Sequence, residues 1–365
     1  MKSKIILLLV VMIACINAAC KKKKKENPDA EFDRAALLTN VRDNIILPQY
    51  GDFVSRLSEL QTAATSFTSS ANITSLENLQ TKFKNAYLAW QKVSAFEFGP
   101  AEQSILRMNM NSFPTDTNQI RSNINSGSYN LNAASNIRAK GFPALDYLLF
   151  SKPVNAILDS FTISSKSTNR KNLLNNIIAD MLSNAQTVNN KWNNEYKNTF
   201  TSNTGTDIGS SISLLVNQLS FECEMVRRER IGNALGYQGI VNTNITNPWL
   251  VEAYYSNYSK PLILENLHNL KNIYSGKNGQ GFDDYLNHIN ADYNGQPLAN
   301  VIMNQFDIAI NAVNQITPDL KTALHNNKPS VDAAFLEVKK LVVLIKIDMT
   351  SQLGLIISYQ DGDGD

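Results

Sequence analysis

Apolar residues recur at three- and four-residue intervals along most of the chain, and this spacing constrains the fold more than any other feature. One series runs from Ile212 to Val226 and another from Phe335 to Met349. Such spacing places apolar side chains on one face of an α-helix, whereas the alternation of a half-buried strand is hard to find. The sequence therefore predicts an all-α protein. The expected helices lie near residues 32–47, 51–67, 75–96, 117–125, 143–150, 170–198, 208–230, 247–274, 281–290, 297–316, 318–326 and 330–359.

Short segments rich in Gly, Pro, Ser, Thr or Asn interrupt this pattern and mark the ends of the expected helices. The segment LPQYG, which begins at Leu47, is one such break. With 365 residues the chain is long enough for two domains of ordinary size, and the Ser- and Thr-rich residues 160–168 are the best candidate linker. We expect two helical bundles, at residues 32–165 and 166–365.

Charge is low and balanced. Charged residues make up 18 % of the sequence and the formal net charge is +2, so no global field gathers nucleic acid. We therefore expect no nucleic-acid partner. The composition is that of a globular protein, with 43 % hydrophobic residues.

The first 31 residues have the pattern of an export signal followed by a tether. Two Lys precede an apolar run that ends in small residues before Cys20, and five Lys follow it. The run is too short to cross a bilayer core of about 30 Å comfortably. Because the residues before Cys20 resemble a bacterial lipobox, we expect a signal peptide at 1–19, lipidation of Cys20 and a Lys-rich tether at 20–31 beside the membrane. Cys15 is a second candidate for lipidation, and a plain secretory signal is the alternative.

Seven short stretches occur in one order along nearly the whole mature chain. They are NIILPQYGDF (44–53), AW with FEFGPAE (89–102), GFPALDYLLF (141–150), RRERIGNALG (227–236), VEAYYSNYS (251–259), GFDDYL (281–286) and DMTSQLGLIISYQDGDGD (348–365). Together they resemble the imelysin family of bacterial cell-envelope proteins. The resemblance implies an all-helical fold of two bundle-like domains, a periplasmic or outer-membrane location and links to iron physiology. Some relatives are described as peptidases, and others are thought only to bind metal or ligand.

The stretch GFPALDYLLF covers the position of the motif Gly-x-His-x-x-Glu, which the resemblance implies is functional. A His and an acid three residues apart on a helix share one face and could converge on one metal ion. Here the matching residues are Gly141, Pro143 and Asp146, and Pro143 has no donor atom for a metal. Asp146 therefore has two open roles. It is a helix-start or buried structural carboxylate, or it is a ligand-binding residue that could hold iron or another divalent metal.

Two further groups of residues are candidates for ligand binding. Glu97 and Glu102 flank a Gly-Pro break and could line a pocket between domains, with a solvated loop edge as the alternative. Arg227 and Arg230 lie in a run of Arg and Glu residues. They could clamp a carboxylate or phosphate, or they could pair with Glu residues along the helix surface.

These features support three hypotheses for function. The first is an envelope-anchored, non-catalytic binding protein linked to metal or iron handling. The second is an imelysin-type metallopeptidase, against which Pro143 argues, because losing one ligand of three or four weakens metal binding severely. The third is a structural or assembly partner in the envelope. A pocket lined by Asp146 with Arg227 or Arg230 would favour the first hypothesis, and a dry apolar interface there would favour the third.

Overall fold

The structure of the protein is a computed structural model that describes residues 31–237 and 245–359. The predicted signal peptide and the lipidation site Cys20 lie outside the described residues. The chain divides into two units, Met1–Asp33 and Arg34–Asp365, and the second holds every helix and strand that the structure describes. Within those two described ranges, no helix is both long and apolar enough to cross a membrane.

Helices dominate the regular structure of the described residues, which confirms the predicted all-α fold. In the first half of the chain the elements are α2 (Arg34–Val41), η1 (Arg42–Ile46), α3 (Leu47–Ser69), α4 (Ile73–Val93), η2 (Ser94–Phe96), α5 (Pro100–Gln103), α6 (Leu106–Met110), α7 (Thr117–Ser126), η3 (Ala134–Ala139), α8 (Gly141–Phe150), α9 (Val154–Thr162), α10 (Ser167–Lys191), η4 (Trp192–Tyr196) and α11 (Lys197–Ser202). In the second half they are α12 (Ser211–Met225), η5 (Val226–Gly232), α13 (Asn233–Leu235), η6 (Pro248–Leu250), α14 (Ser259–Tyr274), α15 (Phe282–His288), β1 (Asp292–Tyr293), β2 (Gln296–Pro297), α16 (Leu298–Asn314), α17 (Leu320–Asn326), α18 (Lys328–Val343), η7 (Leu344–Met349) and α19 (Thr350–Leu353). The segments η1, η4, η5 and η7 are π-helical, and β1 and β2 form a short antiparallel pair.

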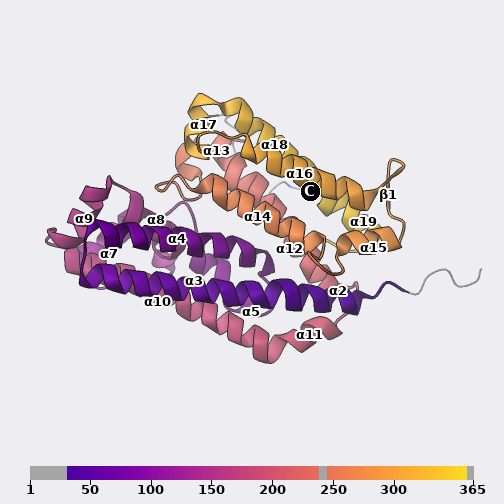
Figure 1. Cartoon of the computed structure of the whole chain (residues 1–365), viewed down its shortest axis with the longest axis horizontal. Helices are drawn as coiled ribbons and strands as arrows, with labels where there is room; N and C mark the ends of the chain where they lie inside the picture. The colour runs from indigo at the N-terminus through magenta and orange to yellow at the C-terminus, as the bar shows by residue number, and fades with distance from the viewer. Residues whose placement is uncertain (1–30, 238–244, 360–365) are drawn as a thin grey trace, which may run out of the picture. The chain divides into compact units, whose positions relative to one another are not determined.

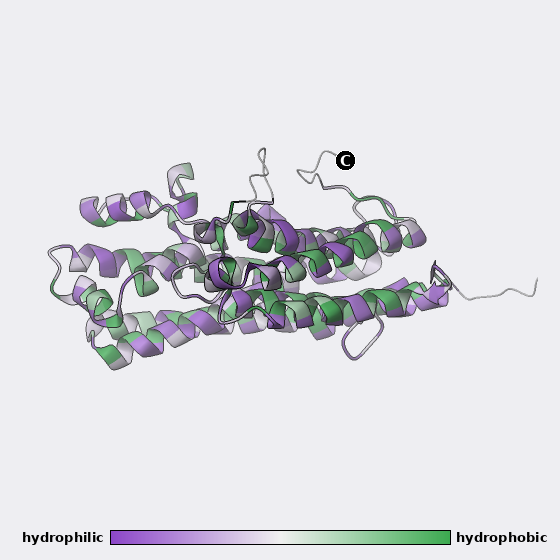
Figure 2. Ribbon diagram, turned by 90° about the horizontal axis from the view of Figure 1, so that it is seen from above, coloured by the Kyte–Doolittle hydropathy of each residue, from purple (hydrophilic) through white to green (hydrophobic). Residues whose placement is uncertain are grey.

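The long helix α3 packs lengthwise on both α4 and α10, and Figure 1 shows the three as parallel rows with α3 in the middle. Aromatic side chains fill the contact: the ring of Phe53 on α3 lies 5.8 Å from that of Trp90 on α4. Phe142 on α8 stacks on Tyr87 of α4 at 4.3 Å, which fixes α8 against this core. In Figure 2 apolar and polar residues share each helix, as expected when one face of an amphipathic helix packs inward.

The second half of the chain forms its own set of packed helices. Helix α12 packs on α14 and α18, and α16 packs on α14 and α18 (Figure 1). Helix α14 also packs on α4, so it joins the two halves directly. The apolar stripes of these helices are buried, for example at Leu215, Leu267, Phe306 and Val338. The α4–α14 contact is where the polar residues described below converge.

The predicted linker at residues 160–168 is largely helical. Helix α9 ends at Thr162 and α10 begins at Ser167. Helix α10, which the prediction placed in the second bundle, packs on α3 and on the short helices α7, α8 and α9. Since residues 34–365 form one compact unit, the division into two bundles at residue 165 remains a prediction.

The predicted helix break at Leu47 is wrong. The backbone stays helical from Arg34 to Ser69, and the π-helical turn η1 lies directly before Pro48. The N–H of Leu47 donates to the carbonyl of Arg42, a wider step than that of an α-helix. Pro48 has no N–H and its ring crowds the preceding helical turn, so the wider π-helical step before it accommodates the proline without a break.

The single helix predicted at residues 247–274 is also wrong. The short 3₁₀ turn η6 and a run of turns at 251–258 precede α14, which begins at Ser259. Ala253 and Asn257 adopt positive φ angles of 52° and 55°, which an α-helix does not allow. The cause lies outside the segment, since its backbone N–H groups are bound by a carboxylate from α8.

Candidate functional site

Helix α8 begins at a position that only glycine can fill. Gly141 has a φ of +69°, and a Cβ atom placed on it would lie 2.2 Å from the carbonyl oxygen of Met110. The preceding residue, Lys140, is buried, and its Nζ lies 3.3 Å from Oδ2 of Asp180 on α10. These contacts hold the start of α8 close to the end of α6 and to α10. They set the position of the two motif residues that follow, Pro143 and Asp146.

Asp146 is a buried structural carboxylate that binds the chain 109 residues further on. Its side chain is 1 % exposed. The backbone N–H of Tyr255 donates to Oδ2 at 2.8 Å, and that of Ser256 donates to Oδ1 at 3.1 Å. Of the two roles left open by the sequence, the carboxylate therefore has a structural one, and its partner is the turn segment at 251–258 rather than the start of its own helix.

The turn segment at 251–258 is held from several sides. The ammonium group of Lys321 on α17 donates to the carbonyl of Tyr254 at 3.1 Å and lies 4.4 Å from the centre of its ring. The Ser259 hydroxyl donates to the carbonyl of Glu252. Together with Asp146, these bonds fix a backbone whose positive φ angles would otherwise be unfavourable.

A cavity of about 210 Å³ lies beside the motif. It is lined by Phe113, Pro114, Thr115, Thr117, Pro143, Asp146, Trp249, Val251, Ala253, Tyr254 and Tyr255. Both Pro143 and Asp146 are among these residues, so the part of the chain that matches the family motif borders a real cavity. Its other wall is the turn segment that Asp146 anchors.

Burial changes the acid–base behaviour of this site. It raises the pKa of Asp146 from 3.8 to about 6, because a carboxylate away from water is costly to ionise. The hydrogen bonds from Ser256 and Tyr255, and the positive charge of Lys321, oppose this rise. The side chain therefore changes charge just below neutral pH.

The residues at the motif do not fit a bound metal ion. Each oxygen of Asp146 already accepts a backbone N–H, and Pro143 offers no donor atom. Across the described part of the chain, no group of three or more His, Cys, Asp or Glu side chains could hold a metal ion. Structural and catalytic zinc sites need at least three protein ligands, so the predicted metal role of Asp146 has no supporting ligand set among the described residues.

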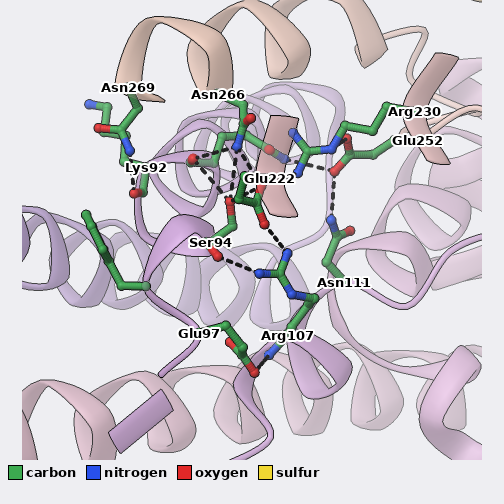
Figure 3. A network of polar contacts seen from close by, with 12 residues as sticks. Lys92, Ser94, Glu97, Arg107, Asn111, Glu222, Arg230, Glu252, Asn266 and Asn269 are labelled. Atoms are coloured by element: carbon green, nitrogen blue, oxygen red, sulfur yellow. Dashed lines mark hydrogen bonds and ion pairs between the residues drawn. The ribbon is translucent and has the colours of Figure 1, made fainter. Parts of the chain in front are cut away.

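A second group of polar residues is buried between α4, α12, η5 and α14 (Figure 3). At its centre Glu222 is fully buried and pairs with Arg107 on one side, and its Oε2 lies 3.4 Å from Nη2 of Arg230 on the other. Nε of Arg230 lies 3.3 Å from Oε2 of Glu252. Burial alone would raise the pKa of Glu222, but Arg107 and Arg230 together lower it.

Amide side chains complete this network. The amide groups of Gln91 and Asn111 donate to Oε1 of Glu252 at 2.8 and 2.7 Å. The amide of Asn266 donates to Glu222 at 3.0 Å, and Figure 3 shows the side chains of Asn266 and Glu222 pointing toward one another. Each carboxylate is thus paired with an arginine and with amides, as buried charges require.

The predicted arginine clamp on a ligand is not what the structure shows. Arg230 is engaged by Glu222 and Glu252, and Nε of Arg227 donates to Glu224 at 3.0 Å. Neither arginine lines the cavity beside Asp146. Arg227 follows the alternative of pairing with a Glu of its own helix, whereas the partners of Arg230 are distant in the sequence.

The two predicted acids Glu97 and Glu102 also lie away from the cavity. Glu97 accepts the backbone N–H of Arg107 at 3.0 Å, and burial raises its pKa although Arg107 opposes the rise. Glu102 is exposed on α5. Glu97 therefore orders the turn before α6, and Glu102 corresponds to the solvated alternative.

Sequence reasoning missed most of the residues that form these sites. Trp249, Tyr254 and Tyr255 line the cavity, while Glu222 and Glu252 anchor the network. The stretch 251–259 had been singled out for its resemblance, but it was assigned to a helix. An acid between Val251 and Ala253 in a long apolar and aromatic run was the available signal that Glu252 is buried with a partner.

A second groove of about 320 Å³, lined mostly by polar residues, lies between α3, α4 and α14. Its charged residues include Asp52, Lys92, Glu265 and His268. The ammonium group of Lys92 lies 3.5 Å from Glu265 and 3.9 Å from Asp52. His268 is exposed, so this groove resembles a solvated surface more than an enclosed site.

Comparison with known proteins gives a consistent result for the whole fold. A family model described as Imelysin matches residues 46–346. A crystal structure described as an iron-regulated protein A precursor of Parabacteroides distasonis superposes with a TM-score of 0.73 at 18 % identity, covering 90 % of this chain and 97 % of that one. An imelysin-like protein from Psychrobacter arcticum gives a TM-score of 0.71 at 16 % identity, covering 91 % and 98 %. No match was found among curated proteins.

Proposed function

The chain belongs to the imelysin family, and on that premise we propose that it is an envelope-anchored protein that binds a small organic ligand without catalysis, in the cavity beside Pro143 and Asp146. One observation carries the proposal: the residues at the positions of the family motif line a cavity, yet they cannot supply a metal centre. The position of the family motif lies at a cavity, but the residues at that position do not provide the side chains that would bind a metal ion.

The lining argues against a metallopeptidase. A catalytic zinc needs three protein ligands and an open position for water. Among the lining residues that the structure describes, Asp146 is the single member of the set His, Cys, Asp and Glu. Its two oxygens hold the backbone of Tyr255 and Ser256. A ligand in this cavity would therefore contact a carboxylate that is held by hydrogen bonds, and no catalytic metal centre.

A role in iron handling extends the proposal to physiology. One structural relative is described as an iron-regulated protein A precursor, and we extend this connection to the present chain. We expect its abundance in its own cells to change when iron is withdrawn. The control is the abundance of another envelope lipoprotein in the same cells. If the abundance of both proteins changes equally, or neither changes, the proposed link to iron is wrong.

The anchor is proposed from the first residues of the chain, which combine an export signal with a lipobox-like site at Cys20. We expect Cys20→Ala to abolish metabolic labelling with a fatty-acid analogue and to release the protein from the membrane fraction. Cys15→Ala is the matched control and should leave the label in place. Labelling that is lost in Cys15→Ala instead would show that Cys15 is the lipidated residue.

Ligand binding can be tested through tryptophan fluorescence. Trp90 and Trp192 are fully buried, whereas Trp249 is 56 % exposed and lines the cavity. A compound that enters the cavity should change the emission of the wild type and leave that of Trp249→Phe unchanged. If a broad set of small organic compounds gives no change that depends on Trp249, the binding role falls and an assembly role in the envelope takes its place.

A further inference from the structure

The composition of the cavity identifies the chemical class of its ligand. Four of its residues are aromatic, namely Phe113, Trp249, Tyr254 and Tyr255. Prolines 114 and 143 add apolar surface, and Asp146 is the single charged residue of the lining that the structure describes. Aromatic faces with one acid form a setting that attracts organic cations, because the ring quadrupole and the carboxylate are both negative toward the ligand.

Building on the proposed function, we propose that this cavity binds a small alkylammonium cation between its aromatic side chains and the carboxylate of Asp146. The aromatic rings would contact the alkyl groups, and the carboxylate would balance the charge. Each ionised carboxylate oxygen has two lone pairs, and the backbone N–H groups of Tyr255 and Ser256 with the Ser256 side chain occupy three of the four. Asp146 can therefore keep its structural bonds while it attracts a cation.

The protein already places a cation against this wall. The ammonium group of Lys321 lies 4.4 Å from the ring centre of Tyr254 and donates to the carbonyl of the same residue. Its charge also acts on Asp146. Tyr254 thus already makes the type of contact that we propose for the cavity.

The size and charge of the cavity exclude the main alternatives. A volume of about 210 Å³ is below the roughly 300 to 1,000 Å³ of pockets for drug-sized compounds, so the ligand is small. The described lining contains no Lys, Arg or His to balance an anion, and Asp146 would repel one. A bare metal ion lacks ligands, as shown above.

The effect of ligand charge on binding can be separated from the effect of ligand shape with three compounds. They are choline, tetramethylammonium and the neutral choline isostere 3,3-dimethyl-1-butanol. Binding is measured on the tag-free mature chain by isothermal titration calorimetry and by the emission of Trp249. We expect both cations to bind and the neutral isostere to bind at least about tenfold more weakly, because it loses the cation–π and charge contributions.

Two variants and one control locate the effect. Asp146→Asn removes the charge contribution but keeps the aromatic rings, so it should weaken choline binding about tenfold and leave binding of the neutral isostere nearly unchanged. Trp249→Leu, at a half-exposed position that does not hold the fold, should weaken it several-fold. Glu77→Gln removes an exposed carboxylate on α4 and should leave choline binding unchanged.

Each contrary outcome has a distinct meaning. Equal binding of choline and the neutral isostere, or no effect of both Asp146→Asn and Trp249→Leu, overturns the cation assignment and leaves a binding site for neutral compounds. Absence of cation binding, with another compound still acting through Trp249, overturns the cation assignment alone. Failure of every compound overturns the proposed function as well.

Discussion

The carboxylate of Asp146 accepts the backbone N–H of Tyr255 at 2.8 Å, and this bond joins a short helix to a turn 109 residues further along the chain. A motif position that the family resemblance connects with chemistry is here used to build the wall of a cavity. Four predictions follow from this bond and from the contacts around it.

The first prediction concerns pH. Burial raises the pKa of Asp146 to about 6, above its ordinary 3.8, so the folded protein binds a proton between these values that the unfolded chain does not. The free energy of unfolding of the wild type, relative to Asp146→Asn, should therefore rise as the pH falls from about 6 to about 4, by on the order of 3 kcal/mol. Urea denaturation of both proteins across this range measures the difference.

Other titratable groups that face Asp146 do not produce a change in the free energy of unfolding between pH 4 and pH 6. They are Lys321, Tyr87 and Tyr255, and burial raises the pKa of both tyrosines further above neutral. Asp159→Asn, which removes an exposed carboxylate of α9, serves as the control for the loss of one negative charge. A difference between Asp146→Asn and the wild type that does not change with pH would mean that the carboxylate of Asp146 is not desolvated.

The second prediction concerns metals. Iron(II), iron(III), zinc(II) and calcium(II) should not stabilise the mature protein, because Asp146 has no partner ligands at the motif. A site filled at 100 times its dissociation constant would add about 2.7 kcal/mol to the free energy of unfolding, which a thermal melt resolves easily. Stabilisation of the wild type that Asp146→Ala abolishes would restore a metal site at this helix.

The third prediction concerns Arg230. Its removal leaves Glu222 and Glu252 buried with fewer partners, so Arg230→Ala should lower the free energy of unfolding by about 3 to 5 kcal/mol. The control is Arg228→Ala in the same π-helical segment, where the pair with Glu229 is more exposed and should contribute at most about 1 kcal/mol. Equal effects in guanidinium denaturation would show that the buried network adds nothing to stability.

The fourth prediction compares two glycines. A methyl group on Gly141 would lie 2.2 Å from the carbonyl of Met110 at a φ of +69°, so Gly141→Ala should destabilise the protein by more than about 2 kcal/mol. Gly51 lies inside α3 with open space around it, and Gly51→Ala should stabilise the protein by about 0.5 to 1 kcal/mol. Circular-dichroism melts of the two variants should therefore shift in opposite directions, and a shift in one direction would contradict the glycine argument.

Much of the fold was predictable because it rests on local spacing. The three- and four-residue intervals located the long helices, including α12 and α18, since one apolar face is enough to specify a packed helix. The predictions failed where a distant group decides the backbone. The turn at 251–258 has helical spacing, yet Asp146 captures two of its N–H groups, and no local pattern reports a partner more than 100 residues away.

The site was predictable only in part, for the same reason. The resemblance pointed to Asp146, which lines a cavity in the structure, and its role as a ligand-binding residue stays a prediction. It also pointed to Arg230, but the role of Arg230 depends on Glu222 and Glu252, which come from other elements. A buried acid and an exposed acid look alike in a helical sequence, so the pairing of these three residues needed the structure.

Glu252 sits between two residues of the cavity lining, Val251 and Ala253, and its own side chain is bound by Arg230 and two amides. The wall is therefore in place before any ligand arrives, and little ordering remains to be done on binding. Entry of the ligand into the cavity should therefore follow single-step binding kinetics. The observed association rate should rise in proportion to ligand concentration, without the plateau that a slow rearrangement of the protein would impose.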